Sequence, residues 1–251
     1  MDMKQILVIM AAVVLVGQSV LADEVVVFKS RVIEEALLKQ MKKPYGKLAS
    51  SPKFTEAELA KVTSLNLSLT EATDEDLMDI IELQNLENLD LSYTKITYVD
   101  LKEVAKLQKL KKLWLSGTKT TDEKLKEFDE EFGEVATFLR LKELFLGGTK
   151  ITDEVFKIII DEGLEKAAKL QKLQRLNLNS TLITDEGFKE VAKLQKLEQL
   201  WLGGTLITDA GLKEVTKLRK LTYLDLRDTK ITGEALAELK KALPDCKIYG
   251  P

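Results

Sequence analysis

Residues Leu197 to Lys220 read L-E-Q-L-W-L-G-G-T-L-I-T-D-A-G-L-K-E-V-T-K-L-R-K, and related stretches recur through most of the chain. Seven copies share the outline L-x-x-L-x-L-x-x-T-x-I-T-D-x-x-L-K-E-V-A-K-L-x-K. They start at Val62, Leu86, Leu110, Leu141, Leu173, Leu197 and Leu221, with spacings of 24, 24, 31, 32, 24 and 24 residues. A unit of this length cannot bury its apolar side chains alone, so we expect the copies to stack around one continuous core.

Each copy divides into a strand, a turn and a helix. The segment L-x-x-L-x-L predicts a short strand whose leucines point inward, while the residues between them face outward. A threonine then closes the turn, and its hydroxyl could bond neighbouring backbone groups. These threonines are Thr94, Thr118, Thr149, Thr181, Thr205 and Thr229. In the first copy we expect Thr70 to lie one place early, which predicts a less regular turn there.

A Thr-Asp pair opens the helix of several copies. The pairs are Thr121-Asp122, Thr152-Asp153, Thr184-Asp185 and Thr208-Asp209. Threonine is a good N-cap residue, and an acid in the first helical turn interacts well with the helix dipole. Because the pairs recur at one position of the repeat, we interpret them as helix caps rather than as catalytic or calcium-binding acids.

The repeat itself indicates the fold class. A period of about 20–29 residues that contains L-x-x-L-x-L is the signature of a leucine-rich repeat solenoid. We therefore predict an α/β fold of seven repeats, curved, with a parallel concave sheet and helices on the convex side. Residues 62–248 resemble bacterial leucine-rich repeat proteins with a T-x-I-T-D turn. The ending Ala242-Leu-Pro-Asp-Cys-Lys-Ile248 resembles exported proteins of planctomycete-type bacteria, and residues 31–67 resemble the N-terminal cap of internalin-like proteins.

Residues 1–22 are expected to be a cleaved export signal. Lys4 precedes an apolar run from Ile6 to Gly17, and Val20-Leu21-Ala22 places compact residues before a cut at Asp23. The run is shorter than the roughly 20 apolar residues of a spanning helix, and an uncleaved anchor is the alternative. We expect no stable membrane span after cleavage, and an exported protein that is periplasmic, at the cell surface or secreted.

Residues 23–61 are expected to form a helical cap, because a terminal repeat would otherwise expose its apolar edge. Arg31–Met41 has helical periodicity, and Pro44 lies in the segment that ends this helix. Thr55–Val62 predicts a second, short helix with Thr55 as its N-cap.

The repeats are expected to occupy residues 62–243, with a C-terminal cap at 244–251. Pro244 stops the last helix, and Cys246–Ile248 predicts a closing strand. We interpret Cys246 as a small buried apolar residue rather than as an exposed thiol.

The third and fourth copies are longer than the others, by seven and eight residues around Glu127–Glu134 and Val155–Ile160. Seven residues make about two helical turns, so the buried face of the third copy stays in phase. Its members are Leu125, Phe128, Phe132, Val135 and Leu139. We expect longer helices on the convex side here. The longer helices have two interpretations. Either helix length varies between copies without functional meaning, or these helices form a second contact surface.

The composition excludes several kinds of site. The chain has no histidine and one cysteine, which removes the commonest general base, the usual zinc ligand sets and any internal disulfide. Lysine plus arginine number 38 against 41 acids, so the net charge of −3 gives no basic surface for nucleic acid. No nucleophile motif or phosphate-binding glycine loop is recognisable. We therefore expect no enzymatic activity, no metal and no cofactor.

Function is expected on the concave face, in the column of residues between the second and third leucine of each strand. In chain order this column is Asn66, Asp90, Trp114, Phe145, Asn177, Trp201 and Asp225. Exposed aromatic rings are typical of binding surfaces, since each can bury about 150–250 Å². Strands lie about 4.8 Å apart, so Trp114 and Phe145 should be neighbours, with Trp201 two strand steps beyond Phe145. Asp90 and Asp225 mark the two ends.

The three aromatic copies alone carry small pairs after the third leucine. The pairs are Ser116-Gly117, Gly147-Gly148 and Gly203-Gly204. The missing side chains could leave room for a partner to approach the rings. Two alternatives stay open, namely that small residues suit the turn or that the rings pack on one another.

Polar residues flank the rings in the column two places earlier, which is Ser64, Asn88, Lys112, Glu143, Arg175, Gln199 and Tyr223. Arg175 and Lys112 suit a ligand that combines an apolar body with an acid. The predicted partner-binding residues are Trp114, Phe145, Trp201, Arg175, Lys112, Asn177, Asp90 and Asp225.

We expect an exported, monomeric protein-interaction module that binds a protein or peptide through its concave face. A shallow sheet offers no deep pocket for a metabolite, and the resemblance implies protein binding without naming a partner. The alternative is a carbohydrate- or cell-wall-binding module in which Trp114, Phe145 and Trp201 stack on sugar rings. An envelope scaffold without a discrete ligand is a third possibility.

Overall fold

The computed structural model describes residues 25–43, 54–97, 103–104, 106–119, 141–154, 156–157 and 172–251. The predicted export signal and the pair Thr121-Asp122 lie outside these residues. So do residues 120–140 and 158–171, which hold the extra length of the third and fourth copies, including Leu125, Phe128, Phe132, Val135 and Leu139. Within the described part of the chain, no helix is both long and apolar enough to cross a membrane.

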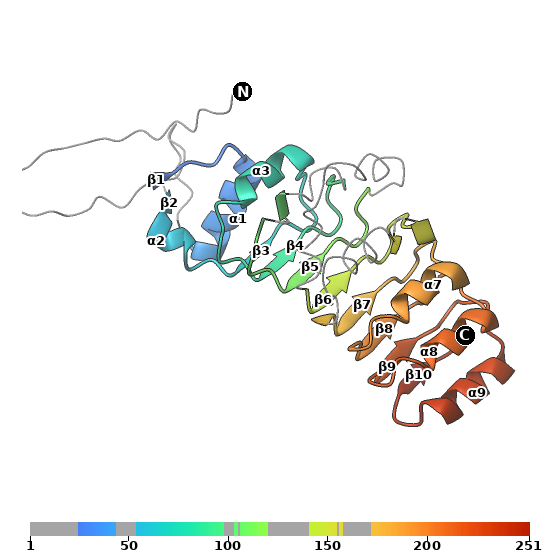
Figure 1. The fold of residues 1–251 in the computed structure, drawn as a ribbon. Helices are drawn as coiled ribbons and strands as arrows, with labels where there is room; N and C mark the ends of the chain where they lie inside the picture. Colours follow the sequence, from blue (N-terminus) through green and yellow to red (C-terminus); the bar gives the residue numbers. More distant parts are fainter. Residues whose placement is uncertain are drawn as a thin grey trace, which may run out of the picture.

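Eight parallel strands form one sheet that runs along the array of repeats (Figure 1). They are β3 (Ser64–Asn66), β4 (Asn88–Asp90), β5 (Lys112–Trp114), β6 (Glu143–Phe145), β7 (Arg175–Asn177), β8 (Gln199–Trp201), β9 (Tyr223–Asp225) and β10 (Lys247–Tyr249). Each strand pairs in register with the next one in the sequence. Residues at the same repeat position therefore form straight columns across the sheet.

The leucines of the repeat pattern form the core, as the alternation predicts. The middle leucine of every strand from β3 to β9 is at most 2% exposed, and the leucine just after each of these strands is fully buried. Full burial of a leucine side chain is favourable by about 1.5–3 kcal/mol. Because each copy covers the leucines of its neighbour, the core is continuous from one end of the array to the other.

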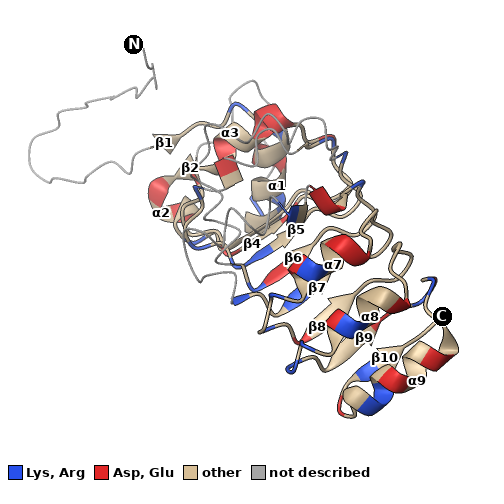
Figure 2. Cartoon of the chain, turned by 45° about the vertical axis from the view of Figure 1, so that its right-hand side comes forward, with Lys and Arg blue, Asp and Glu red and all other residues tan. Residues whose placement is uncertain are grey.

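Helices lie on the opposite side of the sheet, where α7 (Asp185–Val191), α8 (Asp209–Val215) and α9 (Gly233–Ala242) stack along the C-terminal half (Figure 1). Charges of both signs are spread over the strands and helices (Figure 2). The hydroxyls of Thr184 and Thr208 accept hydrogen bonds from first-turn backbone N–H groups at 3.2 and 3.3 Å. The prediction of threonine caps is therefore confirmed for these two helices. The Thr152 hydroxyl is buried without a hydrogen-bond partner, so the side-chain cap predicted there does not form.

The aspartate after each capping threonine joins its copy to the next one. The Asp185 carboxylate accepts hydrogen bonds from the backbone N–H and the hydroxyl of Thr208, at 2.8 and 2.6 Å. The same contact joins Asp74 to Thr97, Asp153 to Thr184 and Asp209 to Thr232. These aspartates thus connect successive copies, a role that the capping pattern alone did not indicate.

The turn threonines bond to the backbone, as predicted. Each hydroxyl donates to the carbonyl three residues earlier, at 2.5–2.7 Å, in Thr94, Thr118, Thr149, Thr181, Thr205 and Thr229. Thr70 does the same to the Leu67 carbonyl at 2.6 Å. The prediction that Thr70 lies one place early is therefore wrong, because it occupies the same turn position as the other threonines.

The N-terminal cap begins with an antiparallel pair, β1 (Val25–Val26) and β2 (Phe54–Thr55). Helix α1 (Arg31–Met41) has the bounds that the periodicity predicts. Helix α2 (Glu56–Leu59) starts with a capping box at Thr55, as predicted, but it ends three residues before Val62. The chain turns after Leu59 because Val62 enters the core at the start of the first copy.

The first copy has little helix beyond its strand. A 3₁₀ turn, η1 (Asp74–Asp76), leads into the four-residue helix α3 (Leu77–Ile80). The Asp79 carboxylate accepts the backbone N–H groups of Lys29 and Ser30 at 2.5 and 2.6 Å. The segment just before α1 is thereby fixed to the first repeat.

The C-terminal cap is close to its prediction. Helix α9 ends at Ala242, ahead of Pro244, and β10 begins one residue after Cys246 and pairs with β9. Cys246 packs against the core but is only half-buried, so the predicted burial of this residue holds in part. Burial still raises the pKa of the thiol to about 11.

Candidate partner-binding face

Five aromatic rings form one continuous row across the concave face, here called the aromatic strip: Trp114, Phe145, Trp201, Tyr223 and Tyr249. The Trp114 and Phe145 rings are stacked, with centroids 5.5 Å apart and planes 11° from parallel. Centroid distances along the rest of the strip are 6.1, 5.3 and 5.4 Å. All five side chains are partly exposed, so the strip presents an apolar surface to solvent.

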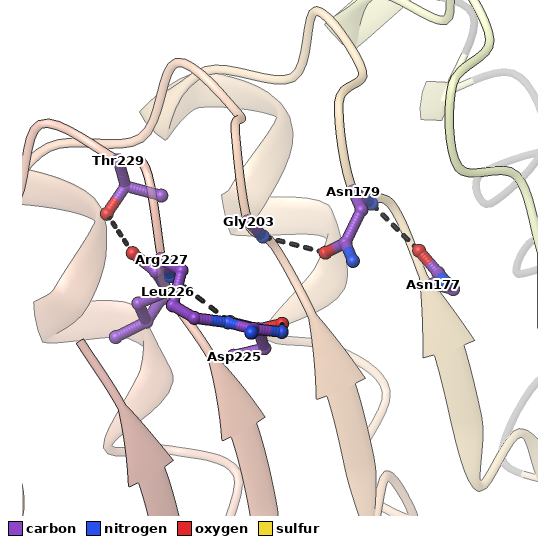
Figure 3. Close-up of polar contacts among 7 residues, drawn as sticks. All are labelled: Asn177, Asn179, Gly203, Asp225, Leu226, Arg227 and Thr229. Carbon is purple, nitrogen blue, oxygen red and sulfur yellow. Dashed lines mark hydrogen bonds and ion pairs between the residues drawn. The ribbon is translucent and has the colours of Figure 1, made fainter. Parts of the chain in front are cut away.

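The aromatic strip is continuous across Asn177, although this residue lies between Phe145 and Trp201 in the strand register. The Asn177 amide oxygen points toward the turn and accepts the backbone N–H of Asn179 at 2.9 Å (Figure 3). With this side chain directed along its own strand, the Phe145 and Trp201 rings meet across β7. Trp114 and Phe145 are neighbours as predicted, and the alternative that the rings pack on one another also holds.

Two rings of the strip were missed by sequence reasoning. Tyr223 belongs to the flanking column and reaches Trp201 diagonally. Tyr249 lies in β10, which has no leucine repeat of its own to reveal its register. The pairing of Tyr249 with Asp225 brings it into the central column. The closing strand predicted at Cys246–Ile248 was the only sequence signal for it.

Beside the strip, one carboxylate bridges the two predicted cationic handles. Glu143 Oε1 lies 2.9 Å from Lys112 Nζ and 3.3 Å from Arg175 Nη1. The in-register pairing of β5, β6 and β7 sets this order of charges. The group carries one net positive charge, and most of the Arg175 donors remain available to a partner. An acid on a partner would therefore share these cations with Glu143.

Asp225 does not face solvent, contrary to expectation. It is 1% exposed, and the Arg227 guanidinium binds both carboxylate oxygens at 2.8 and 2.7 Å (Figure 3). The hydrogen bonds from Arg227 hold the pKa of this carboxyl below its usual range. Asp225 is thus occupied within its own turn. Asp90, at the other end, stays partly exposed, although its Oδ1 accepts the Ser92 N–H at 2.9 Å.

The small pairs beside the rings have a structural cause in the turn. Three residues after the central column, every copy has a residue with positive φ, between 54° and 71°: Leu69, Tyr93, Gly117, Gly148, Ser180, Gly204 and Asp228. Where this residue is not glycine, the residue of the central column in the same copy is Asn or Asp. Its side-chain oxygen accepts a hydrogen bond from the backbone N–H two residues later in the chain, at 2.8–3.2 Å. Tryptophan and phenylalanine cannot accept such a bond, and their copies carry glycine.

This correlation accounts for the second residue of each small pair. Gly117, Gly148 and Gly204 are explained by the left-handed turn, so they are no evidence of room left for a partner. The central column therefore contains two kinds of copy, one with a turn-supporting Asn or Asp and one with a ring and a glycine. In the copies from Val62 to Leu221, rings in the central column occur only where glycine holds the left-handed position.

No metal site is evident in the part of the chain that the structure describes, where no group of three or more acids or cysteines is placed to hold an ion. The candidate site is the aromatic strip with its flanking charges.

Comparison with known proteins agrees with this architecture. A family model described as "Leucine Rich repeat" matches residues 169–192 and 217–240. A crystal structure of internalin C2 from Listeria monocytogenes is similar, with a TM-score of 0.56 at 22% identity, over 89% of this chain and 95% of that one. The fold is that of a leucine-rich repeat protein. The predicted solenoid, with its parallel sheet and stacked helices, is thus confirmed.

A second leucine-rich repeat structure extends the comparison. A protein of Leptospira interrogans matches with a TM-score of 0.50 at 23% identity, over 76% of this chain and 50% of that chain. A comparison with curated proteins finds no match. These likenesses concern the leucine-rich repeat fold, and the resemblance to exported planctomycete-type proteins stays a prediction.

Proposed function

We propose that this leucine-rich repeat protein is an exported interaction module that binds a protein or peptide through its concave face. Leucine-rich repeat proteins typically bind other proteins and are not enzymes. The observation that carries the proposal is the aromatic strip, five partly exposed rings in contact across the sheet.

The strip has the properties of an interface centre. Aromatic rings dominate binding hot spots because they bury a large area with few rotatable bonds. Contact between the rings fixes their orientation before a partner arrives, which lowers the entropy lost on binding. Lys112, Glu143 and Arg175 supply polar contacts along one border of the strip. This arrangement favours an apolar segment that carries an acid near Arg175.

Ring contacts argue against the carbohydrate alternative. Sugars stack on the faces of aromatic rings, whereas here neighbouring rings cover faces that a sugar would need, as in the parallel stack of Trp114 on Phe145. A protein segment can instead pack across the row of rings. We therefore place protein or peptide binding ahead of sugar binding.

Export rests on the N-terminal sequence. Lys4, the apolar run Ile6–Gly17 and the compact residues before Asp23 support a cleaved signal. The test is the intact mass and N-terminal sequence of the protein recovered outside the cytoplasm after expression of the full sequence. We expect a chain that begins at Asp23. A chain that keeps residues 1–22 would overturn cleavage and favour the anchor.

The binding site can be tested by comparative capture. Protein expressed from the full sequence serves as bait for envelope and culture proteins of the organism that encodes it, beside a Trp114→Ala plus Trp201→Ala variant. The matched control is Leu182→Ala plus Leu206→Ala, because these leucines are 45% and 41% exposed but lie outside the sheet. Circular dichroism and melting temperature establish that all three proteins fold.

A captured protein is then purified, and its dissociation constant is measured with each bait. Truncation of one hot-spot ring costs on the order of 2 kcal/mol, or about thirtyfold in affinity. We expect at least this loss for the tryptophan variant and little change for the control. Equal binding by all three baits would disprove the concave site. Quenching of tryptophan fluorescence by short glycans, without protein capture, would favour the carbohydrate alternative.

A further inference from the structure

The two ends of the sheet are covered differently. At the N-terminal end α1 contacts β3, and the Gln40 side-chain amide donates to the Ser64 carbonyl at 2.7 Å. At the other end β10 is the last strand of the sheet, and within residues 172–251 only Gly250 and Pro251 follow it (Figure 1). Among the described residues, β10 is thus an edge strand whose outer side pairs with no other strand.

The open edge presents the backbone of one residue. Lys247 N–H donates to the Thr222 carbonyl, and the Tyr249 carbonyl accepts the Leu226 N–H, both at 2.8 Å and both on the β9 side. Successive residues of a strand direct these groups to opposite edges. The N–H and C=O of Ile248 consequently point away from β9, toward the position that another strand would occupy.

Apolar side chains are exposed at the same end. Leu236 occupies the position of Phe188 and Leu212, which are 0% and 4% exposed in the inner copies. Ile248 occupies the position of Leu224, which is fully buried. Leu236 and Ile248 pack against the core, but both are only half-buried.

We infer that a second copy of this chain covers this end, through antiparallel pairing of the two β10 strands about a two-fold axis at Ile248. In an antiparallel pair, two opposed residues can exchange both of their N–H···O=C hydrogen bonds. Ile248 would do this with Ile248 of the partner subunit. The sheets of the two molecules become one sheet. Leu236 and Ile248 of each molecule are then buried at the joint.

The side chains of β10 are complementary in this register. With Ile248 at the axis, Lys247 lies opposite Tyr249 of the partner subunit. Within one chain the Lys247 ammonium already lies 5.1 Å from the Tyr249 ring centroid, and the Arg227 guanidinium lies 5.8 Å from it. A lysine on an edge strand usually discourages pairing. Here each lysine meets a ring that attracts cations rather than a second lysine.

The same geometry limits the assembly to two copies. An open-ended stack would need the β10 edge of one molecule to meet the β3 edge of the next, and α1 covers β3. A two-fold joint closes on itself. This inference differs from the monomer expected above. It does not rest on the proposed function, although Tyr249 belongs both to the aromatic strip and to the joint.

The primary test measures association directly. Protein expressed from the full sequence is examined by sedimentation velocity over a concentration series, with hydrogen exchange followed at the Ile248 amide. We expect a monomer–dimer equilibrium, and slower exchange at Ile248 as the dimer fills. A monomer at every concentration would overturn the inference, as would a dimer in which this amide exchanges at the monomer rate.

Charge variants test the register. Tyr249→Lys places a cation opposite Lys247 of the partner subunit, so we expect the dimer to dissociate about tenfold or more readily, most strongly at low salt. Adding Lys247→Glu to that variant restores opposite charges across the joint and should recover most of the affinity. The matched control Gln199→Lys adds the same charge to the concave face away from the joint and should change nothing. Dimerisation that Tyr249→Lys leaves unaltered, or that the second change does not rescue, would contradict the register.

Discussion

One hydrogen bond decides which residue can hold the left-handed position of each turn. A left-handed conformation costs an L-residue about 1–2 kcal/mol, and a hydrogen bond contributes about 0.5–1.5 kcal/mol. These magnitudes are similar, so an Asn or Asp side chain can offset a non-glycine residue in the turn. Leu69, which is 80% exposed and has φ 60°, depends in this way on the Asn66 side chain.

Asn66→Ala should therefore lower the free energy of unfolding by about 1 kcal/mol, since the Asn66 oxygen no longer accepts the Ser68 N–H. Adding Leu69→Gly should restore most of the loss, because glycine adopts the left-handed conformation without strain. Urea unfolding of the two variants and of Leu69→Gly alone measures this. If Leu69→Gly destabilises in both backgrounds, the turn explanation fails.

At the scale of the element, the helices depend on the copy before them. The backbone N–H of Gly211 in α8 donates to Asp185 Oδ1 at 3.1 Å, beside the two bonds from Thr208. A Cβ at Gly211 would lie 2.5 Å from that oxygen. The glycine is thus required by the neighbouring copy, even though alanine is the better residue inside a helix.

Gly211→Ala should therefore lower the free energy of unfolding by about 1–2 kcal/mol. This is the net effect, once the higher helix propensity of alanine has been subtracted from the cost of the clash. In an Asp185→Ala background the same substitution should be neutral or stabilising by up to about 1 kcal/mol, because the obstructing carboxylate is gone. A double-mutant cycle from urea unfolding gives both values. The explanation would be wrong if the effect of Gly211→Ala had the same sign and size in both backgrounds.

The docked N-terminal cap carries a pH dependence. Glu34 of α1 is 8% exposed and its Oε1 has no hydrogen-bond partner. Burial, and then the negative charge of Asp79, raise the pKa of Glu34 above its ordinary value of 4.5. The stabilisation from the protonated form is complete below that ordinary pKa. It is lost as pH rises through the raised, folded-state pKa.

Glu34→Gln should accordingly raise the melting temperature near pH 7, and its advantage over the natural protein should vanish below about pH 4.5. The adjacent Glu35→Gln is the control, since Glu35 is exposed and paired with Arg31. Melting temperatures measured across pH for the three proteins provide the test. A constant difference between Glu34→Gln and the natural protein at all pH values would exclude this cause.

At the scale of the whole molecule, contacts between neighbouring copies dominate. In the described part of the chain, each strand of the large sheet pairs with its neighbours in sequence, and α7, α8 and α9 contact one another in order. Stability is then approximately a sum of copies and of interfaces between them. When one complete copy is removed, the copies on either side of it can form the same kind of interface with each other.

Deletion of residues 197–220 removes one 24-residue copy, with β8 and α8, and lets Asp185 meet Thr232. We expect a folded protein with a lower denaturant midpoint and a smaller m-value, because less surface is exposed on unfolding. Deletion of residues 209–220 is the control, since half a copy disrupts the stacking and should abolish cooperative unfolding. Loss of folding after the complete-copy deletion would show that longer-range contacts matter.

The sequence by itself determined the repeat, the buried leucines, the strand positions, the threonine caps of α7 and α8 and the bounds of α1. These features follow from local periodicity, and they recur often enough that chance cannot produce them. It also placed Trp114, Phe145 and Trp201 in one column, because strand alternation is a local rule. The tertiary structure alone decided contacts that depend on side-chain direction between copies, such as the bond from Thr208 to Asp185 and the closure of rings over Asn177. It also separated Asp225 from Asp90, because Asp225 is buried under the Arg227 guanidinium whereas Asp90 stays partly exposed.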